Sequence, residues 1–107
     1  MLKELAIKYF TFFSKKDIDS LAEMLSDSVA LEDWNISRSG KLAVVGAVRE
    51  IFGEVNLIDV KINNICHNRN VVISELKITL DNDSLEVVDV ITFDEDNLIV
   101  NINAYKK

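Results

Sequence analysis

The residue with the clearest capacity for chemistry is an aspartate within an apolar row. In a strand predicted over residues 85–93, alternation places Leu85, Val87, Asp89, Ile91 and Phe93 on one face. Burying an ionised carboxylate costs several kcal/mol unless it is paired, so a buried Asp89 would tend to keep its proton and act as a hydrogen-bond donor. Alternatively, this row faces solvent or a partner subunit, or Asp89 simply binds a backbone amide.

Two further polar groups lie on apolar faces. Asp33 follows Val29 and Leu31 on one face of a short strand predicted over residues 28–34, which makes it a candidate general base. Tyr9 shares the apolar face of an N-terminal helix, which directs its hydroxyl inward. Each also has an ordinary structural interpretation, Asp33 as the start of the loop over residues 35–40 and Tyr9 as a core residue.

The other polar residues favour no second kind of site. The chain has one cysteine, Cys66, and one histidine, His67, which leaves no nucleophile–base pair, internal disulfide or thiolate zinc cluster. The acidic runs 81–83 and 94–96 have the composition of turns and lack the ligand spacing of a calcium loop. We therefore expect neither a metal nor a cofactor.

Charge and hydropathy exclude several classes of partner. The net charge of −6 argues against nucleic acids and anionic membrane surfaces, which both require clustered lysine and arginine. No apolar run approaches the roughly 20 residues of a membrane span. The N-terminal residues mix charged with apolar side chains, unlike a signal peptide. We expect a cytoplasmic location.

These candidate residues must be positioned by one α+β domain over residues 1–107. Apolar residues at spacings of three and four predict helices over 2–14, 18–25 and 41–52. Asp17 is the expected N-cap of the second helix and Ser39 that of the third, which Gly53 should end. After Asn56, alternating residues separated by Asn- and Asp-rich turns predict antiparallel hairpins.

Three segments, AIKYFTFFSKKDIDSLAEMLSDSVALEDW, GAVREIF and VVDVITFDEDNLIVNINAY, resemble the nuclear transport factor two-like superfamily, within it the ketosteroid isomerase and SnoaL-like branch. This resemblance implies a cone-shaped domain, in which three N-terminal helices pack on a curved antiparallel sheet that encloses a pocket. It also implies a homodimer formed through the outer face of the sheet. Ketosteroid isomerases use an aspartate base, with a tyrosine and a protonated aspartate as oxyanion donors. The resemblance assigns these roles to Asp33, Tyr9 and Asp89.

Two positions depart from the isomerase pattern. Trp34 follows the presumed base where the family typically has proline, and Phe52 stands where isomerases often have a supporting tyrosine. We expect both to line the pocket together with Phe13 and Ile91. The two large rings would narrow the pocket, which argues against a steroid-sized substrate.

The sequence supports a small-molecule-binding pocket protein with two main interpretations. The first is an isomerase-like or lyase-like enzyme that moves a proton next to a carbonyl group, with Asp33 as the base. The second is a non-catalytic binder of a small apolar or aromatic ligand. A purely structural domain with a filled pocket is a third. An epoxide-hydrolase-like site is disfavoured, because Arg38, Arg49 and Arg69 lie in a loop, a helix and a turn.

A homodimer is expected from the apolar residues assigned to the exposed sheet face. These are Val88, Val90, Ile99 and Tyr105.

Overall fold

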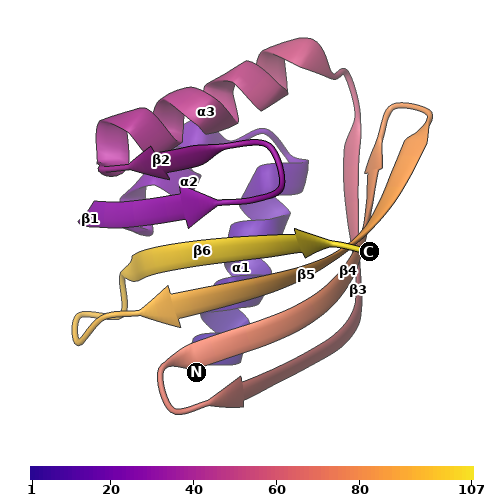
Figure 1. Ribbon diagram of the computed structural model, residues 1–107. Coiled ribbons are helices and arrows are strands. Elements are labelled where there is room, and N and C mark those ends of the chain that lie inside the picture. The colour runs from indigo at the N-terminus through magenta and orange to yellow at the C-terminus, as the bar shows by residue number, and fades with distance from the viewer.

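A computed structural model describes residues 1–107, with three helices on one face of a curved, unclosed six-stranded sheet (Figure 1). The elements in chain order are α1 (Leu2–Ser14), α2 (Ile18–Glu23), β1 (Leu25–Glu32), β2 (Ser37–Ser39), α3 (Lys41–Glu54), β3 (Ile58–Asn68), β4 (Val71–Leu80), β5 (Asp83–Phe93) and β6 (Ile99–Lys106). The predicted α+β class is confirmed, as is the predicted order in which the antiparallel hairpins follow the helices.

The strand order is β2-β1-β6-β5-β4-β3. Neighbouring strands are antiparallel except for β1 and β6, which run parallel. The prediction of a purely antiparallel sheet is therefore wrong at this one pairing. A short hairpin forces antiparallel strands, but most of the chain separates β1 from β6, so no hairpin constrains their relative direction.

The helices begin and end close to the predicted residues. Asp17 caps α2 as expected, its Oδ1 accepting from the Ser20 amide at 3.2 Å. The predicted Ser39 cap of α3 is wrong, because Ser39 pairs with Ala30 in the sheet and Gly40, at φ +92°, precedes the helix. Gly53 lies within α3 rather than ending it. None of the three helices combines the length and the apolarity needed to cross a bilayer.

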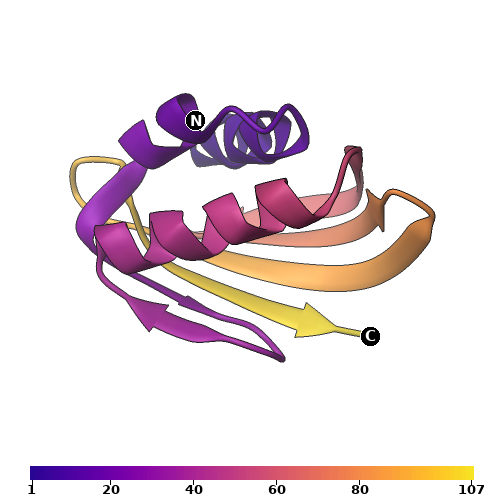
Figure 2. The ribbon, with the colours of Figure 1, turned by 90° about the horizontal axis from the view of Figure 1, so that it is seen from above.

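All three helices lie on the same side of the curved sheet (Figure 2). Helix α1 packs against β3 and β4, while α3 packs against β1 and β2. The pairing register shifts in β1, in β3 between Ile62 and Asn64, and between β5 and β6 after Thr92. Such irregularities bend and twist strands, which accounts for a sheet that curves around α1.

The inner face of the sheet supplies much of the core. Leu76, Val87, Ile91 and Phe93 are each at most 3% exposed. Ile99, expected on the outer face, is 0% exposed and belongs to the core instead. The register shift near Phe93 brings Ile99 opposite that residue and changes the face on which it lies.

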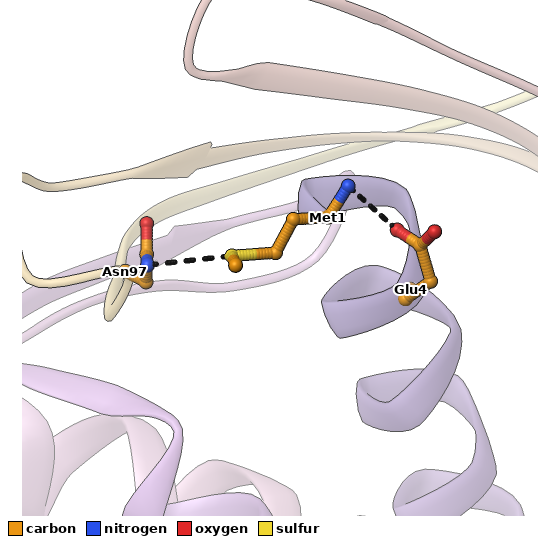
Figure 3. Close-up of polar contacts among 3 residues, drawn as sticks. All are labelled: Met1, Glu4 and Asn97. Carbon is orange, nitrogen blue, oxygen red and sulfur yellow. Dashed lines mark hydrogen bonds and ion pairs between the residues drawn. The ribbon is translucent and has the colours of Figure 1, made fainter.

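The start of α1 lies beside the turn between β5 and β6. Figure 3 shows the Met1 ammonium paired with the Glu4 carboxylate and the Asn97 side chain directed at the Met1 sulfur. The ion pair measures 2.8 Å, and the Asn97 amide nitrogen lies 3.7 Å from the sulfur. Asn97 occupies the left-handed region at φ +63°, which asparagine tolerates in tight turns. The Asn97–Met1 contact joins the start of α1 to the turn between β5 and β6, while the buried face of the helix, which includes Tyr9, packs toward β3 and β4.

Candidate functional site

Asp89 lies on the inner face of β5, as the apolar row predicted. Its cross-strand partners are Ser74 on β4 and Ala104 on β6. The residue is 8% exposed, and its carboxylate makes no hydrogen bond or ion pair within the chain. Loss of hydration on burial raises the pKa of Asp89 to about 7, and the nearby negative charge of Asp33 adds to this effect. Asp89 therefore changes protonation state near neutral pH.

Tyr9 faces the same interior from α1. It is 5% exposed, and its ring contacts Phe10 edge-on at 5.6 Å between centroids. Its hydroxyl has no hydrogen-bond partner in the chain. Burial raises the pKa of the Tyr9 hydroxyl, and the Asp89 carboxylate raises it further. Tyr9 thus remains a neutral O–H donor at physiological pH, close enough to Asp89 to be influenced by its charge.

Asp33 follows β1 and is half-buried. Its Oδ1 accepts from the amides of Asn35 at 2.7 Å and Ile36 at 2.8 Å, which is the turn-forming role considered from the sequence. These bonds engage one carboxylate oxygen and leave the other free. Asp33 is therefore a rigidly held carboxylate that retains an oxygen able to accept a proton.

The register brings Asp33 level with Asp89. Glu32 pairs with Asn103, so Asp33, one residue further, comes beside Ala104, which itself pairs with Asp89. Two strand spacings separate the Asp33 and Asp89 backbones, about 10 Å. The small Ala104 side chain lies between them, and it lines a surface depression of about 280 Å³ with Asp33, Trp34 and Lys106. Tyr9 and Asp89 do not line this depression.

The four residues expected around the pocket lie in different surroundings. Ile91 is fully buried in the core. Phe13 and Phe52 are half-buried and meet edge-on at 5.4 Å between ring centroids, which joins α1 to α3. Trp34 is 41% exposed, with the Lys106 ammonium 5.7 Å from its ring centroid. Phe13 also contacts Tyr9 at 6.4 Å, so the Phe13–Phe52 contact forms a wall beside the Tyr9 ring.

Residues 6–102 match the family of SnoaL-like domains. The chain belongs to this family. The match spans Tyr9, Asp33 and Asp89, so the candidate site of this SnoaL-like chain lies wholly within the matched residues. No curated protein sequence matches the chain significantly.

Solved structures with the same fold have diverse described activities. A proposed ketosteroid isomerase from Kribbella flavida has a TM-score of 0.86 at 16% identity, covering 99% of this chain and 77% of that one. A proposed SnoaL-like polyketide cyclase from Shewanella putrefaciens has a TM-score of 0.87 at 13% identity, covering 98% and 79%. An epoxide hydrolase from M. tuberculosis has a TM-score of 0.83 at 17% identity, covering 99% and 82%. At such identities the likeness establishes the fold of the SnoaL-like chain and leaves its activity open.

Sequence reasoning missed one polar residue of this SnoaL-like interior. Ser74 on β4 is 0% exposed, and its hydroxyl is the one fully buried side-chain polar atom without a hydrogen-bond partner. The sequence contained a signal for this residue. Ser74 interrupts the apolar row of Val72, Leu76 and Ile78, just as Asp89 interrupts the apolar row of its own strand.

Proposed function

We propose that this SnoaL-like chain binds a small, mainly apolar carbonyl compound between α1 and the sheet, and moves a proton on the carbon beside the carbonyl group. The observation that carries the proposal is the pair formed by Tyr9 and Asp89. Both are at least nine-tenths buried in an apolar interior, and neither polar group has a partner. Buried polar groups are normally satisfied, so two unpartnered groups facing one interior are suited to a ligand oxygen.

The proposed reaction assigns a role to each of the three polar groups. The free oxygen of Asp33 removes a proton from the carbon next to the carbonyl. The electron pair of that C–H bond forms a carbon–carbon double bond to the carbonyl carbon, and the π pair of the carbonyl moves onto its oxygen. Tyr9 and protonated Asp89 donate hydrogen bonds to this developing oxyanion. Asp33 then returns its proton to a different carbon, so the carbon–carbon double bond shifts and no external reactant is consumed.

The pKa of about 7 defines when Asp89 can act as a donor. Below this pH Asp89 carries the proton and can donate it in a hydrogen bond, whereas above it the carboxylate repels an oxyanion. The reaction should therefore slow as the pH rises through neutrality.

The test is an absorbance assay with a cyclic β,γ-unsaturated ketone, whose double bond moves into conjugation with the carbonyl group. The expected result is turnover that Asp33→Asn abolishes while the fold is kept. Absence of turnover by the wild-type protein over a panel of ring sizes would overturn the catalytic proposal.

A second candidate function, non-catalytic binding, is favoured by the hydrogen bonds of Asp33. Its two backbone acceptor contacts explain its presence as a turn residue without any catalytic role. In that case Tyr9 and Asp89 would anchor the polar atom of an aromatic or apolar ligand. Naphthol, an aromatic molecule with a single polar atom, can serve as the probe ligand. Equal naphthol affinity of wild type and Asp33→Asn, without turnover of any ketone, would support this candidate.

We also propose that two copies of the chain pair through the outer sheet face. Ile73 is 37% exposed and Tyr105 is 60% exposed, and the half-buried Val88 and Val90 lie beside them by register. Together they form an apolar patch on an otherwise polar face. Gel filtration should show a species of twice the 12.1 kDa chain mass, and Val90→Lys should convert it to the monomer. A wild-type monomer at micromolar concentration would contradict the pairing.

A further inference from the structure

Ser74 is directly opposite Asp89 in the antiparallel pairing of β4 with β5. Its other cross-strand partner is Ile65, and its same-face neighbours along β4 are Val72 and Leu76. The residues next to Asp89 on β5, Val87 and Ile91, are apolar as well. Within this part of the sheet, the Asp89 carboxyl is therefore the one side chain with which the Ser74 hydroxyl can form a hydrogen bond.

Energetics favour such a bond. A fully buried hydroxyl without a partner costs about 1–3 kcal/mol, and a hydrogen bond to a charged group is stronger than one between neutral groups. Side chains directly opposite in an antiparallel pair have Cβ atoms about 4.5–5.5 Å apart, a gap that a serine hydroxyl and a carboxylate together can close. The Ser74 hydroxyl has no partner in the structure, so the bond requires a rotation about the Cα–Cβ bond of Ser74 that turns Oγ toward β5.

We propose that Ser74 is a positioning residue, which donates a hydrogen bond to one oxygen of Asp89 and leaves the other oxygen directed at the ligand. This inference rests on the proposed function for the ligand, but the contact between Ser74 and Asp89 is independent of it. Ser74 itself is fully covered, whereas Asp89 keeps an exposed fraction of 8%, so Asp89 meets the ligand and Ser74 acts through it.

The contact has a titration signature. A hydroxyl donor stabilises the ionised carboxylate more than the neutral acid, so Ser74 opposes the effect of burial on the pKa of Asp89. The other titratable groups near Asp89 are Asp33 after β1, whose charge raises the pKa of Asp89, and Tyr9 on α1, whose pKa is raised by the Asp89 charge. Its β6 neighbour is the apolar Ala104, and the Lys106 ammonium further along lies over Trp34.

The experiment follows the Asp89 carboxyl by carbon NMR during a pH titration of the ligand-free protein. Ser74→Ala should lower the acid dissociation constant of Asp89 by about tenfold, since a charge-assisted bond is lost. Ser74→Thr, which keeps the hydroxyl, should stay within about threefold of wild type. Ser84→Ala, at an exposed position of β5, is the matched control and should have no effect. An unchanged or increased dissociation constant in Ser74→Ala would overturn the inference.

A parallel measurement of naphthol binding separates this inference from the proposed function. A shifted Asp89 titration in Ser74→Ala, with no naphthol binding by the wild-type protein, supports the Ser74–Asp89 contact and counts against the ligand site. Naphthol binding by wild type with an unshifted titration supports the ligand site and overturns the role of Ser74.

Discussion

Asp33 and Asp89 lie on either side of Ala104 on the inner face of the sheet, and the charge of Asp33 helps to raise the pKa of Asp89 to about 7. The two carboxyl groups reach this arrangement from segments more than 50 residues apart, through the parallel pairing of β1 with β6. Their surroundings differ, since one is held by turn amides and the other is buried without a partner. Such a difference is what separates a proton acceptor from a proton donor.

The first prediction concerns this coupling. Asp33→Asn should lower the pKa of Asp89 from about 7, because the neutral amide removes the nearby charge. Burial, the larger cause, should keep the value above 3.8. Carbon NMR of the aspartate carboxyls measures the change. An Asp89 titration identical in wild type and Asp33→Asn would show that the two groups are not coupled.

The substitution Asp33→Asn should also preserve the fold. The amide oxygen of an asparagine can still accept from the Asn35 and Ile36 amides, so the free energy of unfolding should stay within about 1 kcal/mol of wild type. Asp33→Ala loses both bonds and should be less stable by about 1–2 kcal/mol. Urea denaturation compares wild type, Asp33→Asn and Asp33→Ala. Equal losses of unfolding free energy in the two variants would contradict the role of Asp33 in holding the turn.

Asp89→Asn should stabilise the protein at alkaline pH. The pKa of Asp89 is raised in the folded state, so the folded protein holds this proton more tightly than the unfolded chain. Its contribution to stability is fully present below about pH 4 and is lost as the pH rises to about 7. At pH 8 the asparagine variant should exceed wild type by on the order of 2–4 kcal/mol, and this advantage should vanish near pH 4. Urea denaturation at both pH values measures this difference.

Asp59→Asn, on the exposed face of β3, is the control for this prediction. Equal pH dependence of the free energy of unfolding in wild type and Asp89→Asn would contradict burial of the charge.

Tyr9→Phe should weaken ligand binding without weakening the fold. The Tyr9 hydroxyl has no partner in the chain, so its removal should change the free energy of unfolding by less than about 1 kcal/mol. Loss of one donor to the ligand oxygen should reduce naphthol affinity by about tenfold. Isothermal titration calorimetry measures the naphthol dissociation constants of wild type and Tyr9→Phe. Tyr105→Phe, at a 60% exposed position, is the matched control, and equal effects of the two substitutions would refute a ligand contact at Tyr9.

Ala104→Leu should block the space between the two carboxyl groups. The larger side chain would fill the gap beside Asp33 and Asp89 while leaving every polar group in place. We expect a loss of naphthol binding of at least tenfold, with a modest change in stability at a half-buried position. Asn101→Leu, on the opposite face of β6, controls for strand effects. Unchanged binding in Ala104→Leu would place the ligand elsewhere.

The sequence predicted most of the elements because their signals are local. The apolar face of residues 2–14 and the alternation in residues 85–93 depend on nearest neighbours, and both elements appear as expected. The parallel β1–β6 pairing and the burial of Ile99 depend on register between distant strands, which local patterns do not encode.

For the candidate site, too, local sequence signals were predictive and features that depend on distant segments were not. An isolated polar residue in an apolar row identified Asp89, and it could equally have identified Ser74. The hydrogen bonds of Asp33 and the outward position of Trp34 depend on the conformation of the turn after β1, where β2 formed instead of a loop. Resemblance to isomerases gave roles for three residues, but their distances require the assembled sheet.

The most direct test of the ligand site is a crystal structure of the protein with naphthol bound. The proposed function predicts the naphthol oxygen within about 3 Å of both Tyr9 Oη and a carboxyl oxygen of Asp89, with the rings beside Ala104. A naphthol bound only at the surface depression near Trp34, with Tyr9 and Asp89 still covered, would contradict it.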